Sequence, residues 1–355
     1  MIKKILNVIF IIAILGTTLI FITGCGNNKD SKEEKVKIVT ENYSEGKLEY
    51  TFDDENKTAV VTGIKGSIKF DEKKEITEII IPNTVVKDNT NYKVSSIRAG
   101  SYSSSAFSGL QNLNSIVLPS DFTLPQYAFS YCVSLQKITL PNGITKIPTG
   151  TFYYCKNLSD ISIPNTVNEI GNSVFINCNK LETVSFPDSI TKIGQQTFHE
   201  CESLKSVKLP NNLTSLGYET FGYCPNLESV ELPNGLKEIP SSTFTECGNL
   251  KEINIPNSVT KIGGAAFYKC TSLTDISIPD NVTEIGGVAF AECTSLKSIT
   301  IPSSVEKIEA RVFTRCKDLT IYVKGKKEAP KGWDTAWNDL YGAGSTEKVK
   351  TVWDN

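Results

Sequence analysis

The sequence predicts a solenoid of stacked 23-residue repeats, made mostly of short parallel β-strands and short helical turns and capped at both ends. Phenylalanines recur every 23 residues, at Phe129, Phe152, Phe175, Phe198, Phe221, Phe244, Phe267, Phe290 and Phe313. Cysteines keep the same step, at Cys132, Cys155, Cys178, Cys201, Cys224, Cys247, Cys270, Cys293 and Cys316. Prolines keep it too, at Pro141, Pro164, Pro187, Pro210, Pro233, Pro256, Pro279 and Pro302. Three residue types in one register indicate a repeat array, so the length of 355 residues does not imply two average domains.

The first half of each repeat predicts a half-buried strand. One unit, residues 155–175, reads CKNLSDISIPNTVNEIGNSVF. Leu158, Ile161 and Ile163 form the pattern L-x-x-I-x-I, and the last pair alternates inward and outward as side chains on a strand do. Pro164 lacks the N–H that a strand ladder needs, so the strand is expected to end there in a turn.

The second half of the repeat brings the chain back to its starting point, one layer further on. Val167 and Ile170 form a second inward pair on a short extended segment, and Gly171 allows the next bend. Residues 173–177 are expected to carry Phe175 inward on one helical turn. A unit then has about seven apolar side chains on one side, each worth roughly 1.5 to 3 kcal/mol when buried. Only stacking on another unit covers them, with strands about 4.8 Å apart.

The repeat pattern resembles a known family. It reads L-x-x-I-x-I-P-x-x-V-x-x-I-G-x-x-x-F-x-x-C, as in Leu273, Pro279, Phe290 and Cys293. Over about residues 107–319 the chain is similar to the bacterial surface leucine-rich repeats of the BspA-like type. The resemblance implies a leucine-rich-repeat solenoid that is right-handed and curved, display on the bacterial surface, and protein binding or adhesion.

Residues 1–24 resemble the signal peptide of a bacterial lipoprotein. Lys3 and Lys4 precede an apolar run that ends at Ile22, and Cys25 follows it directly after a Thr-Gly pair. In such signals the thiol of the cysteine takes the lipid, so Cys25 is the expected lipidation site. An uncleaved transmembrane anchor and an ordinary signal peptide are the alternatives.

Residues 25–46 are expected to form a flexible tether, because they are polar and charged and cannot bury enough apolar area to fold. Together with the signal, the tether predicts an extracytoplasmic protein that is membrane-anchored at the bacterial cell surface through lipidated Cys25.

The remaining boundaries follow from departures from the repeat. Residues 47–106 are expected to form an N-terminal cap with a β-hairpin, Leu48–Phe52 and Thr58–Ile64, and a degenerate repeat around Ile79. The solenoid then covers residues 107–319, and residues 320–355 form a C-terminal cap. All three tryptophans lie in this last segment, where they either cover the final layer or form an aromatic ligand platform; they are Trp333, Trp337 and Trp353.

The composition argues against several function classes. A formal charge of −2 and a pI near 5.8 do not favour a nucleic-acid partner. His199 is the single histidine, it is expected at a solvated position, and mechanisms that need two imidazoles are excluded. No glycine loop of the phosphate-binding type and no C-x-x-C pair is present. We therefore expect no enzyme activity, no metal and no cofactor.

Nine periodic cysteines in an exported protein could form disulfides. Their number is odd, they recur at an inward position, and side chains stacked in parallel make poor disulfide geometry. The expectation is a column of reduced, buried thiols.

Two surfaces are candidates for binding. The outward positions of the first strand are small and polar and lack aromatic anchors, so they favour a solvated ladder. Tyrosines gather instead just before the cysteines, and Tyr131, Tyr153 and Tyr154 fall in adjacent layers. They are the predicted ligand-binding residues, with ordinary packing of tyrosines as the alternative.

The sequence thus predicts a surface-anchored leucine-rich-repeat protein that mediates protein binding or adhesion. Its partners would be a protein ligand from a host or from the envelope, and the membrane through the lipid anchor. The alternative function is a structural or scaffolding lipoprotein of the cell envelope without a soluble ligand.

Overall fold

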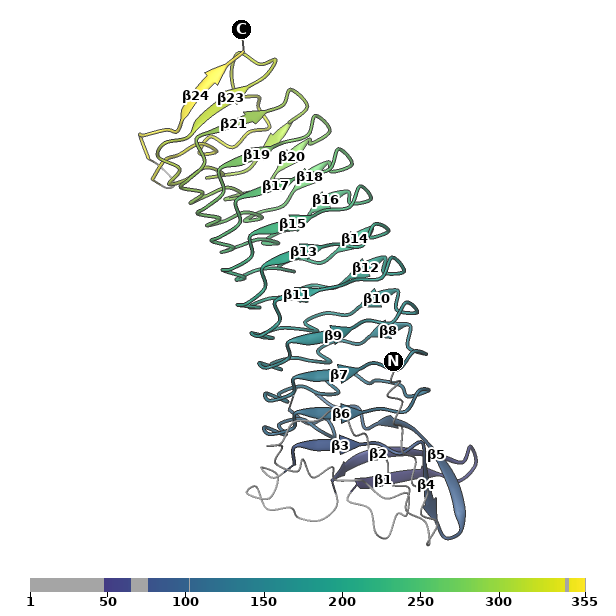
Figure 1. Cartoon of the computed structure of the whole chain (residues 1–355). Coiled ribbons are helices and arrows are strands. Elements are labelled where there is room, and N and C mark those ends of the chain that lie inside the picture. Colours follow the sequence, from purple (N-terminus) through teal and green to yellow (C-terminus); the bar gives the residue numbers. More distant parts are fainter. Residues whose placement is uncertain (1–47, 65–75, 102, 342–344, 355) are drawn as a thin grey trace, which may run out of the picture.

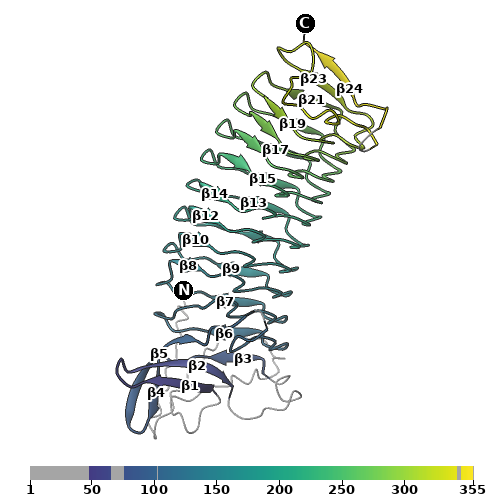
Figure 2. The same ribbon diagram turned by 180° about the vertical axis from the view of Figure 1, so that it is seen from behind.

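The computed structural model describes residues 48–64, 76–101, 103–341 and 345–354. The expected signal peptide, Cys25 and the tether lie outside the described residues. Within them the chain winds into a curved solenoid of stacked layers (Figures 1 and 2). No helix in the described part is long and apolar enough to span a lipid bilayer.

The first strand of each repeat forms one long column of parallel strands (Figure 1). Its register advances by one repeat per layer, so that Lys137 pairs with Asp160 and Ser206 with Ser229. In β7, β9 and β15, for example, the inward residue is buried and its neighbours are exposed, as the alternation predicts. The strands are β3 (Glu78–Ile80), β6 (Ser115–Val117), β7 (Lys137–Thr139), β9 (Asp160–Ser162), β11 (Thr183–Val184), β13 (Ser206–Lys208), β15 (Ser229–Glu231), β17 (Glu252–Asn254), β19 (Asp275–Ser277), β21 (Ser298–Ile301) and β23 (Thr320–Val323).

The second extended segment of each repeat forms a second column of two-residue strands. They are β8 (Lys146–Ile147), β10 (Glu169–Ile170), β12 (Lys192–Ile193), β14 (Ser215–Leu216), β16 (Glu238–Ile239), β18 (Lys261–Ile262), β20 (Glu284–Ile285) and β22 (Lys307–Ile308). The column splits into two four-stranded sheets between β14 and β16. The N–H that follows each strand normally donates to the layer before, as Gly194 does to the carbonyl of Ile170 at 2.8 Å. Pro240 follows β16 and has no N–H to donate, which accounts for the break.

The third side of each layer is not the helical turn that the sequence predicted. Phe152 and Tyr154 donate their N–H groups to the next layer, at 3.0 and 2.8 Å, while Cys155 donates to Phe152 within its own turn at 3.0 Å. The left-handed backbone at Gly150 (φ 62°) and Tyr154 (φ 61°) produces this alternation. A helix would direct every N–H along its own chain, so the expectation was wrong: these residues form turns linked from layer to layer.

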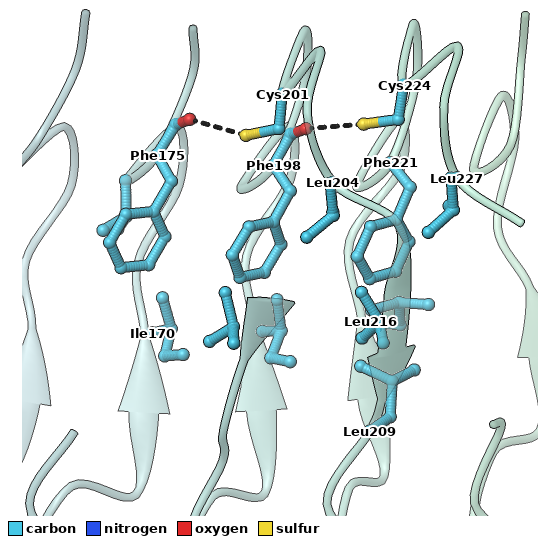
Figure 3. Packing of buried hydrophobic residues seen from close by; sticks show 14 of the residues in the cluster. Ile170, Phe175, Phe198, Cys201, Leu204, Leu209, Leu216, Phe221, Cys224 and Leu227 are labelled. Atoms are coloured by element: carbon cyan, nitrogen blue, oxygen red, sulfur yellow. Dashed lines mark hydrogen bonds between the residues drawn. The ribbon is translucent and has the colours of Figure 1, made fainter. Parts of the chain in front are cut away.

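A column of phenylalanine rings fills the centre. Consecutive rings from Phe107 to Phe313 are near-parallel, with centroids between 5.2 and 6.5 Å apart. Each of these rings is fully buried. Figure 3 shows Phe175, Phe198 and Phe221 in consecutive layers, with aliphatic residues such as Ile170 beside them.

The N-terminal cap contains the expected hairpin and an additional one. Strands β1 (Leu48–Asp53) and β2 (Thr58–Ile64) are antiparallel, as predicted. They belong to a four-stranded sheet of order β1-β2-β5-β4, with β4 (Thr84–Lys87) and β5 (Thr90–Ile97) joined by Asp88 and Asn89. Both turn residues have positive φ, at 50° and 60°, as a two-residue hairpin requires.

The C-terminal cap covers the last layer with tryptophans, as the first of the two interpretations predicted. Trp337 packs edge-on against Phe313 at 6.1 Å, and Trp333 packs against Trp337 at 4.9 Å. Strand β23 pairs one residue out of step, with Ser298 opposite Thr320. Beyond it, β24 (Lys350–Trp353) adds one more parallel strand that the sequence did not predict.

Replacing one central ring should destabilise the whole chain. Phe198→Ala removes a fully buried ring between two others, and we expect the free energy of unfolding to fall by about 3 to 5 kcal/mol. Urea unfolding followed by circular dichroism measures the loss. Ser206→Ala, at an exposed position of β13, is the control and should change stability by less than about 0.5 kcal/mol. Equal effects of the two substitutions would contradict this packing.

Candidate functional site

The residues just before the cysteines form a regular column along one side of the solenoid, here called the pre-cysteine column. Every member has a left-handed backbone, with φ between 56° and 63°. This conformation is uncommon for residues with a side chain. It turns each N–H toward the next layer, as in the 2.7 Å bond from Tyr131 to the carbonyl of Tyr153. The column consists of Tyr131, Tyr154, Asn177, Glu200, Tyr223, Glu246, Lys269, Glu292 and Arg315.

The structure brings the three predicted binding residues together. The rings of Tyr131 and Tyr154 stack at 5.0 Å, and Tyr153 lies 5.6 Å from Tyr131 and 4.7 Å from Tyr154. Tyr127 joins the group at 6.4 Å from Tyr153. We call these four residues the tyrosine cluster. All four are half-buried, so the rings support one another and keep part of their surface open.

The phenols of Tyr153 and Tyr154 remain neutral over the physiological pH range. Burial, reinforced by Tyr131 and Tyr154, raises the pKa of Tyr153 to about 12. Burial also raises the pKa of Tyr154, with a further contribution from the negative charge of Glu200. The cluster therefore offers apolar ring surface together with hydroxyls that can donate or accept hydrogen bonds.

Further along the pre-cysteine column, side chains pair between neighbouring layers. The amide of Asn177 donates to the carboxylate of Glu200. Lys269 bonds Glu246 at 2.8 Å, and Arg315 bonds Glu292 at 2.9 Å. The equal backbone geometry of all layers places successive side chains next to each other, so these contacts follow from the repeat.

His199 is not the solvated residue that the sequence predicted. Its side chain is only 14% exposed, with Nε2 3.4 Å from Glu200 and its ring 5.1 Å from that of Tyr223. The ring folds over the next layer, where position 222 is a glycine and leaves room: a Cβ on Gly222 would lie 3.1 Å from Nδ1 of His199. The expectation was wrong because Gly222, in the next layer, has no side chain, and the imidazole of His199 packs into the space that this leaves.

The outer face of the first strand column is a polar ladder, as expected. Lys208 and Glu231 pair across adjacent strands at 2.8 Å, and Lys137 lies 3.8 Å from Asp160. These side chains are about 70% exposed, so water and salt screen such pairs and they contribute little to stability. The face offers no concentrated anchor for a partner.

A shallow hollow of about 130 Å³ lies beside β18, β20 and β22. Its lysines already have partners: Lys261 lies 3.4 Å from Glu284 and Lys307 lies 2.9 Å from Glu309. Among the described residues, no group of three or more His, Cys, Asp or Glu side chains is placed to hold a metal ion.

The nine repeat cysteines are free and buried, as predicted. Each thiol donates to the backbone carbonyl of the phenylalanine in the preceding layer, at 3.1 to 3.4 Å. Figure 3 shows two such bonds, from Cys201 to Phe175 and from Cys224 to Phe198. Burial raises the pKa of the Cys132 thiol from 9.0 to about 12. These thiols are structural donors, because a buried group with a raised pKa forms little reactive thiolate.

Two exposed tyrosines lie beyond the cluster. Tyr223, in the pre-cysteine column, is 40% exposed and contacts His199. Tyr218, near the bend of the same layer, is 46% exposed. Their positions in the repeat can be read from the period, whereas the exposure of each ring depends on the side chains of the neighbouring layers.

Comparison with known proteins agrees with this architecture. The sequence profile of a family described as BspA type leucine rich repeat region matches residues 64–205 and 191–320, with 6 copies of the repeat. The matched residues make up more than half of the chain. None of the curated proteins compared with the chain matches it.

Two solved structures are similar over most of the chain. A leucine-rich repeat protein from Bacteroides ovatus ATCC 8483 is 24% identical, covers 87% of this chain and 98% of its own, and has a TM-score of 0.57. A leucine rich cell surface protein from Faecalibacterium prausnitzii A2-165 is 25% identical, covers 86% of this chain and 95% of its own, and has a TM-score of 0.54. At 24% identity, the similarity to the Bacteroides ovatus protein shows a shared fold alone.

The thiol column predicts that stability falls in alkali. An unfolded thiol ionises near its ordinary pKa of 9.0, whereas a folded one such as Cys224, with a pKa of about 12, stays protonated. Above about pH 9 the unfolded state therefore binds fewer protons, and the free energy of unfolding decreases as the pH rises. Urea unfolding at a series of pH values, with reductant present, measures the slope. In Cys224→Ala the decline should be shallower, and a flat profile up to about pH 10.5 would show that the thiols are not buried as described.

Proposed function

Because the chain belongs to the BspA-type leucine-rich repeat family, we propose that it is an extracytoplasmic protein that binds another protein through the tyrosine cluster. The proposed anchor is a lipid on Cys25, which would hold the solenoid at the bacterial membrane, and adhesion is the proposed consequence of binding. The description of the similar Faecalibacterium prausnitzii protein as a cell surface protein supports the location. The family is one of repeat proteins, and no enzyme activity is proposed.

The stacked rings of the tyrosine cluster carry this proposal. Tyr131, Tyr153 and Tyr154 contact one another on a backbone that is hydrogen-bonded from layer to layer. Side chains held in this way lose little conformational freedom when a partner binds. Tyrosine is also enriched among the residues that dominate binding energy at protein interfaces. The outer face of the strands from β7 to β19 presents small and polar side chains and no stacked rings, so the cluster is the better candidate.

The proposal is tested by capturing partners and then removing the cluster. Purified full-length chain is immobilised, and proteins from envelope and host-cell extracts are tested for saturable binding. With a confirmed partner, Tyr131→Ser combined with Tyr154→Ser should lower the affinity at least about tenfold, because stacked ring area is lost. Surface plasmon resonance measures the affinity, and circular dichroism checks that the variant is folded.

Two tyrosines far from the cluster provide the matched control. Tyr322 and Tyr341 are 45% and 53% exposed near the C-terminal end. Replacing both with serine should leave the affinity unchanged. If the cluster variant binds as well as the control variant, the proposed site is wrong. If neither extract contains a saturable partner, the alternative of a scaffolding envelope lipoprotein is favoured instead.

A further inference from the structure

The carboxylates beside the cysteine turns differ in the charge of their partners. Glu246 and Glu292 each bond a lysine or an arginine of the next layer. Glu200 instead accepts a hydrogen bond from the amide of Asn177, and Glu219 accepts one from the amide of Gln196 at 2.7 Å. An amide satisfies a hydrogen bond and leaves the negative charge in place.

No lysine or arginine among the described residues forms an ion pair with Glu200 or Glu219. The carboxylate of Glu200 lies 3.4 Å from Nε2 of His199. This contact is an ion pair only when the imidazole is protonated. Both acids lie on left-handed backbone: Glu200 (φ 58°) occupies the second left-handed position of its layer, and Glu219 (φ 54°) occupies the first left-handed position of the next layer. Two positioned carboxylates therefore retain their charge on this part of the surface.

Aromatic rings border these carboxylates. Tyr223 follows Glu200 in the pre-cysteine column and is 40% exposed, and Tyr218, beside Glu219, is 46% exposed. On the other side, the charge of Glu200 acts on the phenol of Tyr154. The face of Tyr154 already accepts a cation, because Lys156 Nζ lies 5.9 Å from its ring centroid. Carboxylates next to ring faces attract cations by direct charge and by the ring quadrupole.

We propose that the surface from Tyr154 to Tyr223, called the acidic-aromatic surface, binds an arginine- or lysine-rich segment of the partner protein. A guanidinium group suits this surface best, because it can donate to a carboxylate such as that of Glu200 and its planar face can stack on an exposed ring such as that of Tyr223. The inference rests on the proposed binding function and specifies the charge of the partner. The acidic-aromatic surface adjoins the tyrosine cluster through Tyr154, so one segment can contact both.

The test uses purified full-length chain and a fluorescently labelled tetra-arginine peptide at low salt, where attraction between charges is least screened. Fluorescence anisotropy gives the affinity. Glu200→Gln combined with Glu219→Gln should weaken binding at least about tenfold, because two uncompensated charges are lost. Tyr223→Leu should weaken it several-fold, and tetra-glutamate should not bind.

The matched control changes the net charge by the same amount at paired sites. Glu246→Gln combined with Glu292→Gln neutralises two acids that already have basic partners. It should change tetra-arginine binding no more than about twofold. If both double variants lose affinity equally, peptide binding depends only on the net charge of the protein, and the inference is wrong. Circular dichroism melting verifies that every variant is folded.

A second readout separates this inference from the proposed function. The captured partner is tested against the Glu200→Gln and Glu219→Gln double variant and against the variant that lacks Tyr131 and Tyr154. Loss of affinity in both supports the acidic-aromatic surface. Loss only in the tyrosine variant overturns the inference and leaves the proposed function standing. Loss in neither overturns both.

Discussion

Each layer of this solenoid has an apolar face that only a neighbouring layer can cover, and the rest of the structure depends on that constraint. The ring of Phe198 lies between those of Phe175 and Phe221, at 5.2 and 5.5 Å, and all three are fully buried. One unit alone would leave such rings in water. Backbone and thiol hydrogen bonds then fix the distance between layers on every side, so that apolar burial and hydrogen bonding reinforce each other.

Because the repeated inward residues hold the layers together, the residues at outward positions can differ from layer to layer. The inward positions keep the same residue types through the array, whereas the pre-cysteine column holds tyrosine, asparagine, glutamate, lysine and arginine on one backbone conformation. In four pairs of neighbouring layers the equivalent side chains contact each other. Tyrosines stack, opposite charges pair, and acids beside amides keep their charge. The tyrosine cluster and the acidic-aromatic surface are thus two outcomes of one geometry.

Features that depend on the 23-residue period could be predicted from the sequence, whereas features that depend on single residues could not. The repeat, the two inward pairs and the contact among Tyr131, Tyr153 and Tyr154 all follow from equal spacing. The left-handed turns did not, because such a backbone usually signals glycine or asparagine and residues like Val288 occupy it here (φ 51°). The burial of His199 depends on the missing side chain of Gly222 in the next layer. Strand β24 returns after a long connection, and no periodicity marks it.

The most direct test removes one layer. Deleting residues 192–214 takes out 23 residues and joins Thr191 to Ser215, which occupies the position of Lys192 one layer on. Deleting residues 192–203 takes out about half as much chain and joins two unlike positions. Stacking of equivalent layers predicts that the whole-layer variant unfolds cooperatively in urea and that its remaining thiols do not react with a thiol reagent before it unfolds. The half-layer variant should be far less stable. A half-layer variant as stable as the whole-layer variant would contradict the account.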